Sequence, residues 1–227
     1  MIIDSHHHLW RYDPVEYDWI DGSMEDLRRD FIVDELDVVL AENGVDGSVV
    51  IQARQSRDET DWLLSAAVAS DRILGVVGWL DLCAADFGSQ LGEYEGRVEL
   101  KGLRHVLQGE QDRSLVLRQD FQRGLKSLAE SGLGYDMLIF PDQLTFVEEA
   151  CQRVPELRCV LDHAAKPRMT RDDFDIEWAR GILSLARNTD ILCKVSGLVT
   201  EAATNASDSV FEPYLDHLLE HFGQDRL

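Results

Sequence analysis

Residues 2–10 read IIDSHHHLW: two isoleucines lead into an aspartate, a serine and three consecutive histidines. The β-branched start predicts a strand, and the side chains of a strand alternate between its two faces. Asp4, His6 and His8 therefore share one face, and His7 points to the other. A purification tag does not explain three histidines inside an apolar stretch. The first strand is thus expected to end in two imidazoles, where a doubly wound fold often carries a glycine-rich phosphate loop.

Amphipathic helical patterns separate this strand from six further strand-like runs. The seven predicted strands are Ile2–His6, Gly47–Ala53, Ile73–Leu80, Gly102–Val106, Tyr135–Phe140, Arg158–His163 and Ile191–Ser196. Alternation of strands and helices implies parallel strands joined by right-handed crossovers. An open doubly wound sheet and a closed (β/α)₈ barrel both fit this pattern. A barrel collects its chemistry at the C-terminal ends of its strands, and the polar residues fall there, so an α/β fold of the TIM-barrel type is predicted.

The polar side chains at these strand ends are candidates for an active site. They are His6 and His8, Gln52, Trp79, Arg104 and His105, His163, Lys194 and Ser196. His6 and His8 are placed to share one metal ion, and Asp4 lies two residues before His6, where its carboxylate would orient the ring. His163 adds a third histidine to the same rim.

Two cationic positions also indicate chemistry at this rim. Lysine is rarely buried without a partner or a task, so Lys194 either lines the barrel mouth or, if its strand ends early, is merely solvated; we favour the barrel mouth. Arg104 and His105 are expected to hold an oxygen-rich ligand. The segment Arg11–Asp30 is long for a loop between strand and helix, and it is either a lid over the mouth or a loop packed on the barrel side. Ser56 and Glu59 have capping-box spacing, which predicts that a helix begins there.

The charge balance restricts the partners. Among 227 residues, 22 Lys and Arg face 43 Asp and Glu, a formal net charge of −21. Such an acidic surface repels phosphate backbones and anionic lipid, so neither nucleic acid nor a membrane is expected as a partner. The sequence shows no leader pattern and no apolar run of roughly 20 residues, so a cytoplasmic location is expected. The four cysteines form no CxxC pair and are expected to be reduced core residues. A homo-oligomer is compatible with all of this.

A competing motif lies near the end of the chain. His217–His221 read HLLEH, the His-x-x-Glu-His pattern of inverted zinc proteases. Leu218 and Leu219 fall on the expected buried stripe of that helix, which leaves the two histidines at its flanks. We therefore favour the strand-end site.

Seven blocks of sequence, in order, resemble one known family. They are IDSHHHLWRYDP, FIVDEL, GVDGSVVIQA, GVVGWLDL, KGLRHVLQGE, VLDHAAKP and LCKVSGLVTEA. Together they resemble the sugar-lactone hydrolase branch of the amidohydrolase superfamily over essentially the whole chain. The resemblance implies a TIM-barrel hydrolase of carbohydrate metabolism, a lactonase that opens a sugar-acid lactone by attack of activated water on the ring carbonyl.

The resemblance in these blocks also implies roles for individual residues. His6, His8 and His163 either bind one divalent cation, zinc before others, or donate hydrogen bonds directly to the carbonyl, because the branch includes lactonases that work without metal. We expect His105, His163 and Lys194 to be catalytic. The expected substrate contacts are Gln52, Trp79, Arg104 and Ser196.

One departure from the family concerns the end of the chain. In the family, a segment like FGQDRL leads into a last strand whose aspartate is a metal ligand and the general base. Seven strands are predicted here, and a barrel has eight. We therefore expect residues 1–227 to form one barrel domain lacking its C-terminal strand and the following helices, with the general-base aspartate beyond Leu227.

Two other functions stay open at this point. Related barrels decarboxylate aromatic or muconate acids with a similar ligand set, so an amidohydrolase-type decarboxylase is the second enzyme hypothesis. A barrel without its eighth strand is, alternatively, a catalytically inert remnant or a binding protein.

Overall fold

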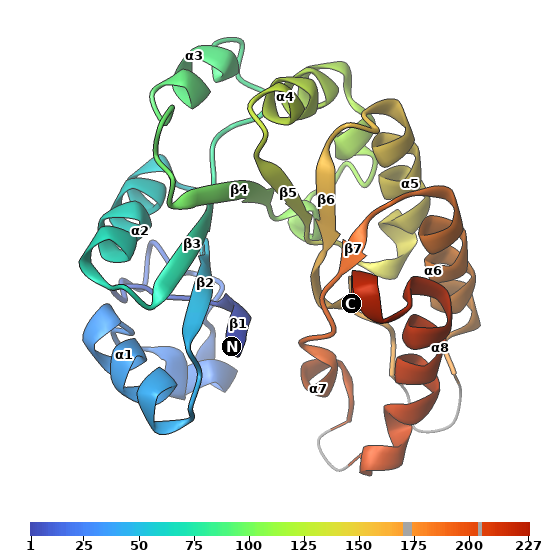
Figure 1. Ribbon diagram of the computed structural model, residues 1–227. Coiled ribbons are helices and arrows are strands. Elements are labelled where there is room, and N and C mark those ends of the chain that lie inside the picture. The colour runs from blue at the N-terminus through green and yellow to red at the C-terminus, as the bar shows by residue number, and fades with distance from the viewer. Residues whose placement is uncertain (170–173, 204–205) are drawn as a thin grey trace. The chain divides into compact units, whose positions relative to one another are not determined.

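The computed structural model describes residues 1–169, 174–203 and 206–227. The chain divides into two compact units, one of Met1–Asp81 with Ser89–Arg104 and one of Leu82–Gly88 with His105–Leu227. In both units, parallel strands alternate with helices, and the described residues contain seven strands in total (Figure 1). This is the strand–helix plan of a TIM barrel, as the sequence predicts. That the whole chain forms a single domain stays a prediction.

The first unit carries strands β1 to β4, paired in chain order. Its elements are β1 (Ile3–His7), α1 (Val33–Glu42), β2 (Gly47–Ile51), α2 (Arg57–Ala69), β3 (Ile73–Gly78), α3 (Phe87–Gly92) and β4 (Leu100–His105); α3 and β4 each contain a boundary between the units. Ile3 pairs with Gly47, and Val50 with Val76. The middle strands β2 and β3 are almost wholly apolar because both of their faces are covered.

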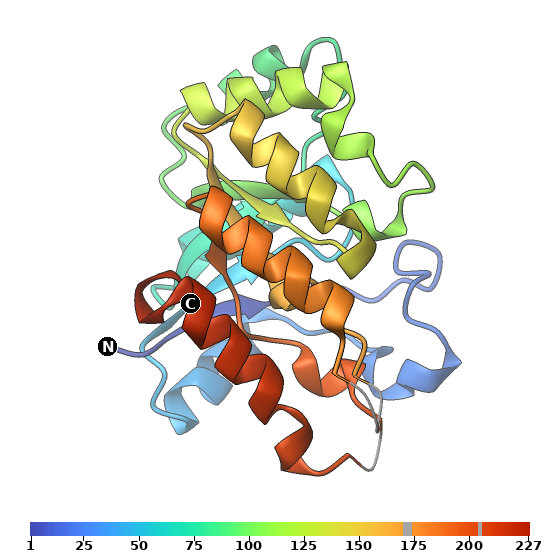
Figure 2. The ribbon, with the colours of Figure 1, turned by 90° about the vertical axis from the view of Figure 1, so that its right-hand side faces the viewer.

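The second unit carries strands β5 to β7, also paired in chain order. Its elements are α4 (Gln119–Glu130), β5 (Gly134–Met137), α5 (Leu144–Arg153), β6 (Arg158–Leu161), α6 (Ile176–Asn188), β7 (Leu192–Cys193), α7 (Leu198–Glu201) and α8 (Glu212–Phe222). Gly134 pairs with Arg158, and Leu161 with Cys193. Helices α5, α6 and α8 lie side by side along one face of this unit (Figure 2). Trp178 on α6 is completely buried at the centre of that layer.

All seven predicted strands are present, but every strand except β1 ends one to three residues earlier than the sequence pattern indicated. Several polar residues at the predicted ends, such as Gln52, Trp79 and Lys194, therefore lie in the loops that follow, whereas Arg104 and His105 remain in β4. The clearest case is β6, which ends at Leu161 so that Asp162 and His163 belong to the turn that follows. Loops after parallel strands are where a barrel places its chemistry.

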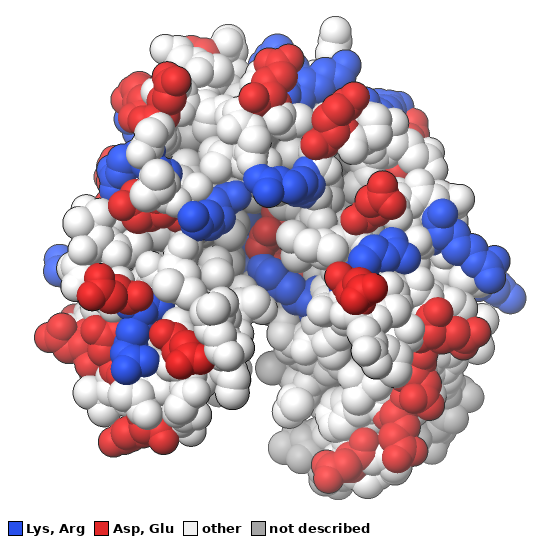
Figure 3. All heavy atoms as spheres, viewed as in Figure 1, with Lys and Arg blue, Asp and Glu red and all other residues white. Residues whose placement is uncertain are grey.

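The face drawn in Figure 3 carries charges of both signs. Acidic side chains are scattered over both units on the face drawn in Figure 3, with Lys and Arg among them. No helix in the described residues is long and apolar enough to cross a membrane. The four cysteines are free, and three of them are buried, as predicted.

Candidate active site

The end of β1 places two histidines together. The rings of His6 and His8 are 5.0 Å apart between centroids, edge to face. His7 points elsewhere: its Nε2 lies 3.0 Å from the hydroxyl of Ser48 on β2. The alternation predicted for this strand is therefore confirmed. The Asp4 carboxylate accepts a hydrogen bond of 3.0 Å from the backbone N–H of His6, and its expected orientation of the His6 ring stays a prediction.

His8 is held in a neutral form. Its Nδ1 lies 2.9 Å from the carbonyl oxygen of Ile51. A carbonyl only accepts, so Nδ1 carries the proton and Nε2 carries a lone pair. Burial lowers the pKa of His8 well below its usual value, and the neighbouring Arg104 guanidinium and His6 lower it further. A neutral imidazole with a free lone pair is the form that binds a metal ion.

Arg104 and Gln52 form a reciprocal pair between β4 and the end of β2. The Gln52 side-chain amide donates to the Arg104 carbonyl oxygen at 3.3 Å, and the guanidinium donates to both the carbonyl and the side-chain oxygen of Gln52. Gln52 has no solvent exposure and Arg104 only 3%. Nη1 of Arg104 also lies 3.4 Å from Nε2 of His6. Gln52 thus holds the guanidinium that faces the histidine pair.

Trp79 follows β3 and is fixed through its backbone. The Thr60 hydroxyl on α2 accepts from the Trp79 N–H at 2.8 Å and donates to the Trp79 carbonyl at 2.9 Å. This close approach requires glycine at position 78, because a Cβ there would lie 2.5 Å from the Thr60 methyl group. The indole of Trp79 is half-buried at this strand end.

In the second unit, Lys194 lies between two buried carboxylates. Its ammonium is paired with Asp136, from β5, and lies 3.0 Å from Oδ1 of Asp162. The lysine side chain is 13% exposed, and Asp162 is completely buried. Lys194 is therefore a buried lysine partnered by two aspartates, and its place at the barrel mouth stays a prediction.

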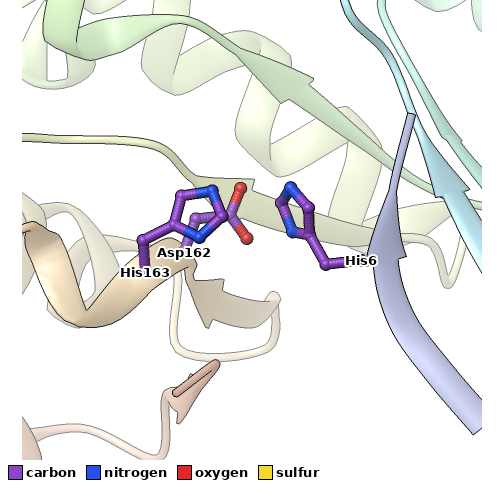
Figure 4. Close-up of side chains that lie close together, drawn as sticks. All are labelled: His6, Asp162 and His163. Carbon is purple, nitrogen blue, oxygen red and sulfur yellow. The ribbon is translucent and has the colours of Figure 1, made fainter. Parts of the chain in front are cut away.

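His163 is oriented by Ser196, the residue two positions beyond Lys194. Nδ1 of His163 lies 2.8 Å from the Ser196 hydroxyl. Figure 4 shows the His163 imidazole and the Asp162 carboxylate side by side after β6. A hydroxyl can donate or accept, so this contact fixes the plane of the His163 ring and is compatible with either tautomer.

His105, the last residue of β4, has a carboxylate partner. Its Nε2 lies 2.7 Å from Oε1 of Glu110, and the His105 side chain is 11% exposed. The backbone carbonyl of Glu110 in turn accepts from Arg113 at 3.3 Å. The histidine is thus locked in one orientation by a charged group.

The long segment after β1 closes on itself. Trp10 and Phe31 exchange backbone hydrogen bonds of 3.0 and 2.9 Å at its two ends. Trp10, Tyr17 and Ile20 form a small core, against which Ala53, in the loop after β2, packs. The segment therefore packs against the loop after β2 in its own unit, and its role as a lid stays a prediction.

The Glu59 carboxylate forms hydrogen bonds both to this segment and to the loop after β2. As predicted, α2 begins after Ser56, whose hydroxyl accepts from the Glu59 N–H. The buried Glu59 carboxylate accepts 3.0 Å hydrogen bonds from the N–H groups of Ala53 and Arg54, and one of 3.1 Å from the Tyr17 hydroxyl. Burial raises the pKa of Glu59, and the same hydrogen bonds oppose that shift.

Three acidic residues of this region were missed by the sequence analysis: Asp136, Asp162 and Glu110. Asp136 is the one acidic residue in the apolar run YDMLIF, and Asp162 directly precedes His163, so both carried a visible signal. Glu110 gave no such signal, because its pairing with His105 depends on a loop.

At the competing HLLEH motif, Nε2 of His217 lies 2.8 Å from the Ala179 carbonyl oxygen. This nitrogen therefore takes part in the packing of α8 against α6.

Comparison with known proteins identifies the class. The amidohydrolase family model matches residues 3–227, so the chain belongs to the amidohydrolase family. It is 40% identical over 235 residues to an L-fucono-1,5-lactonase of Burkholderia multivorans, covering 99% of this chain and 79% of the relative. It is 30% identical over 225 residues to an L-fucono-1,5-lactonase of Burkholderia ambifaria, covering 99% and 77%.

Solved structures agree with this membership. A crystal structure of an amidohydrolase from Burkholderia multivorans with bound zinc is 39% identical, with a TM-score of 0.94, and covers 100% of this chain and 82% of that one. A probable 2-pyrone-4,6-dicarboxylic acid hydrolase from Acinetobacter baumannii, 17% identical over 100% of this chain and 81% of its own, has a TM-score of 0.78 and shows the fold alone. The protein is thus a hydrolase of the amidohydrolase family with a TIM-barrel type of fold.

Proposed function

We propose that this hydrolase opens a sugar-acid lactone, and that the substrate is a six-membered 1,5-lactone of the L-fuconic type. The observation that carries the proposal is the 40% identity to an L-fucono-1,5-lactonase across 99% of this chain. The buried, charge-paired residues at the strand ends support it, because ester hydrolysis needs an activated water and donors for the developing oxyanion. Both kinds of group are available at these strand ends.

We further propose that His6, His8 and His163 bind one divalent cation, zinc before others, with Asp162, next to His163, as a further oxygen ligand. Imidazole and carboxylate groups are the ligand types of catalytic zinc sites, which keep one position open for water. The Ser196 hydroxyl, 2.8 Å from Nδ1 of His163, supports this assignment because it orients the ring. A relative with 39% identity binds zinc. Bound zinc would lower the pKa of water and polarise the lactone carbonyl.

The remaining residues are assigned to the substrate. The Arg104 guanidinium, fixed by Gln52, and the Lys194 ammonium supply positive charge near the oxygen that becomes an alkoxide when the ring opens. His105, locked by Glu110, is assigned to hold or return a proton at that oxygen. Trp79 and Ser196 complete the proposed substrate contacts.

The test is a substrate panel with the purified chain, assayed with added zinc and with a chelator. Acid release from L-fucono-1,5-lactone, its epimers and an unsubstituted six-membered lactone would be followed with a pH indicator. We expect the hydroxylated lactones to be opened, and His163→Ala to lose this activity. Release of CO₂ from aromatic acids without lactone turnover would overturn the proposal in favour of a decarboxylase. Turnover of neither class would favour the inert or binding protein.

A further inference from the structure

Directly after β6 the backbone makes a left-handed turn of four non-glycine residues. The φ angle is +53° at His163, +48° at Ala164, +57° at Ala165 and +52° at Lys166. These are the non-glycine residues with positive φ in the described ranges of the chain. In this conformation the Cβ of an L-residue crowds the next carbonyl oxygen, and left-handed residues normally occur singly. Such a turn persists only where the surrounding structure holds it.

The turn is held from the helix layer by Trp178. Its indole Nε1–H donates to the carbonyl oxygen of Ala164 at 2.6 Å. Trp178 and Ala164 are both completely buried, so no water competes for this bond. On the other side of the turn, the Ala164 N–H donates to the Lys194 carbonyl at 3.1 Å. The peptide groups of Ala164 are therefore fixed between α6 and the end of β7.

The turn decides where two consecutive side chains point. Residues 162 and 163 would face opposite sides of an extended strand. Because the chain turns left-handed at His163, Asp162 meets Lys194 at 3.0 Å while His163 meets Ser196 at 2.8 Å. Both partners lie on the same stretch after β7. The fit is tight, since a Cβ at Gly197 would lie 3.0 Å from Nδ1 of His163.

We propose that Trp178 is a positioning residue: its indole N–H holds the left-handed turn and thereby aims His163, with Asp162 beside it, at the ligand. The functional part of this inference rests on the proposed metal-binding role of these two residues. Trp178 itself is buried in α6, on the opposite side of the turn from the Lys194 contact, and acts only through the Ala164 carbonyl. Removing the N–H while keeping a large ring should therefore loosen the aim of His163 without opening the core.

The experiment compares Trp178→Phe with Tyr214→Phe, which removes a polar atom from the same aromatic cluster but has no bond to the turn. Three quantities are measured: hydrogen exchange of the Ala164 and Lys166 amides, zinc affinity by competition with a chelator, and lactone turnover. For Trp178→Phe we expect the Ala164 and Lys166 amides to exchange faster. Zinc affinity and kcat should fall about 10- to 100-fold, the usual effect of losing a group that orients a metal ligand. Tyr214→Phe should leave all three near wild type.

A rescue variant separates positioning from simple packing. Glycine adopts positive φ without strain, so Ala164→Gly in the Trp178→Phe background should restore at least half of the lost affinity on a logarithmic scale. A lower melting temperature with wild-type zinc affinity, or unchanged protection of the two amides in Trp178→Phe, would overturn the inference. If the wild type neither binds zinc nor opens a lactone, the proposed function fails, and the amide exchange still decides whether Trp178 holds the turn.

Discussion

Nζ of Lys194 lies 3.0 Å from Oδ1 of Asp162, a carboxylate without solvent exposure, and the same ammonium is paired with the buried Asp136. Two carboxylates therefore lie beside one ammonium in a region that water scarcely reaches. Buried ions depend on their partners, because removing one partner of a buried pair is strongly destabilising.

The variant Lys194→Met tests how much this buried ion pair contributes to the stability of the fold. Methionine keeps much of the apolar stem, so the sequence alone suggests little effect on stability. The structure predicts the opposite, because the change removes the ammonium that two buried carboxylates share. We expect the free energy of unfolding to fall by about 3–5 kcal/mol, the usual cost of removing one partner from a buried pair. Urea unfolding measures it.

The matched control is the double variant Lys194→Met with Asp136→Asn, which also removes one of the two carboxylate charges beside Lys194. It should recover part of the lost stability while lactone turnover stays low. A single variant as stable as the wild type would show that these carboxylates are hydrated in solution.

The histidine run offers a second test within three residues. His6→Ala should strongly lower lactone turnover, because it removes a proposed metal ligand. The loss should exceed the roughly 10- to 100-fold that follows when a residue that only orients a ligand is removed. His7→Ala should keep turnover near wild type, since its ring lies on the other face and contacts Ser48. Losing that contact should cost about 0.5–1.5 kcal/mol of stability. Steady-state kinetics and thermal unfolding of both variants measure this, and equal loss of turnover would contradict the assigned faces.

The fold could be predicted from the sequence because its signals are local. Each strand is a short β-branched run, and each helix has an apolar stripe, so element type and order need no knowledge of distant contacts. Strand ends were less predictable. Residues such as His163 continue the strand pattern by composition, but a neighbouring strand and a buried indole impose a left-handed turn on them.

The candidate site was predictable in part for the same reason. The histidines and Lys194 stand out because such residues are unusual in or after apolar runs. Asp162 was not predicted as a site residue, because its ion pair with Lys194 joins the ends of two different strands and leaves no mark in the local sequence. The pairing of His105 with Glu110 depends on the path of a loop, which composition does not encode.

Metal removal tests the proposed ligand set. Chelation followed by desalting should abolish turnover, and stoichiometric zinc should restore it. Zinc at 100 times its dissociation constant should also stabilise the fold by about 2.7 kcal/mol, because it binds the native state. His163→Ala should show no such zinc-dependent shift in melting temperature. Full turnover by protein shown to be metal-free by mass spectrometry would mean that the histidines act as hydrogen-bond donors instead.

The buried Glu59 predicts a pH dependence of stability with a definite sign. Because burial raises the pKa of this carboxyl above its usual 4.5, the folded chain binds this proton more tightly than the unfolded chain does. The corresponding stability is present below pH 4.5 and is lost as the pH rises through the raised pKa. Glu59→Gln cannot ionise, so the stability of the wild type relative to this variant should fall between pH 4.5 and 7, by at most about 1.4 kcal/mol per pH unit. Urea unfolding across this range measures the difference, with Glu42→Gln, an exposed glutamate on α1, as the control. A relative stability that grows with pH would mean that the hydrogen bonds from Tyr17, Ala53 and Arg54 outweigh burial and lower the pKa instead.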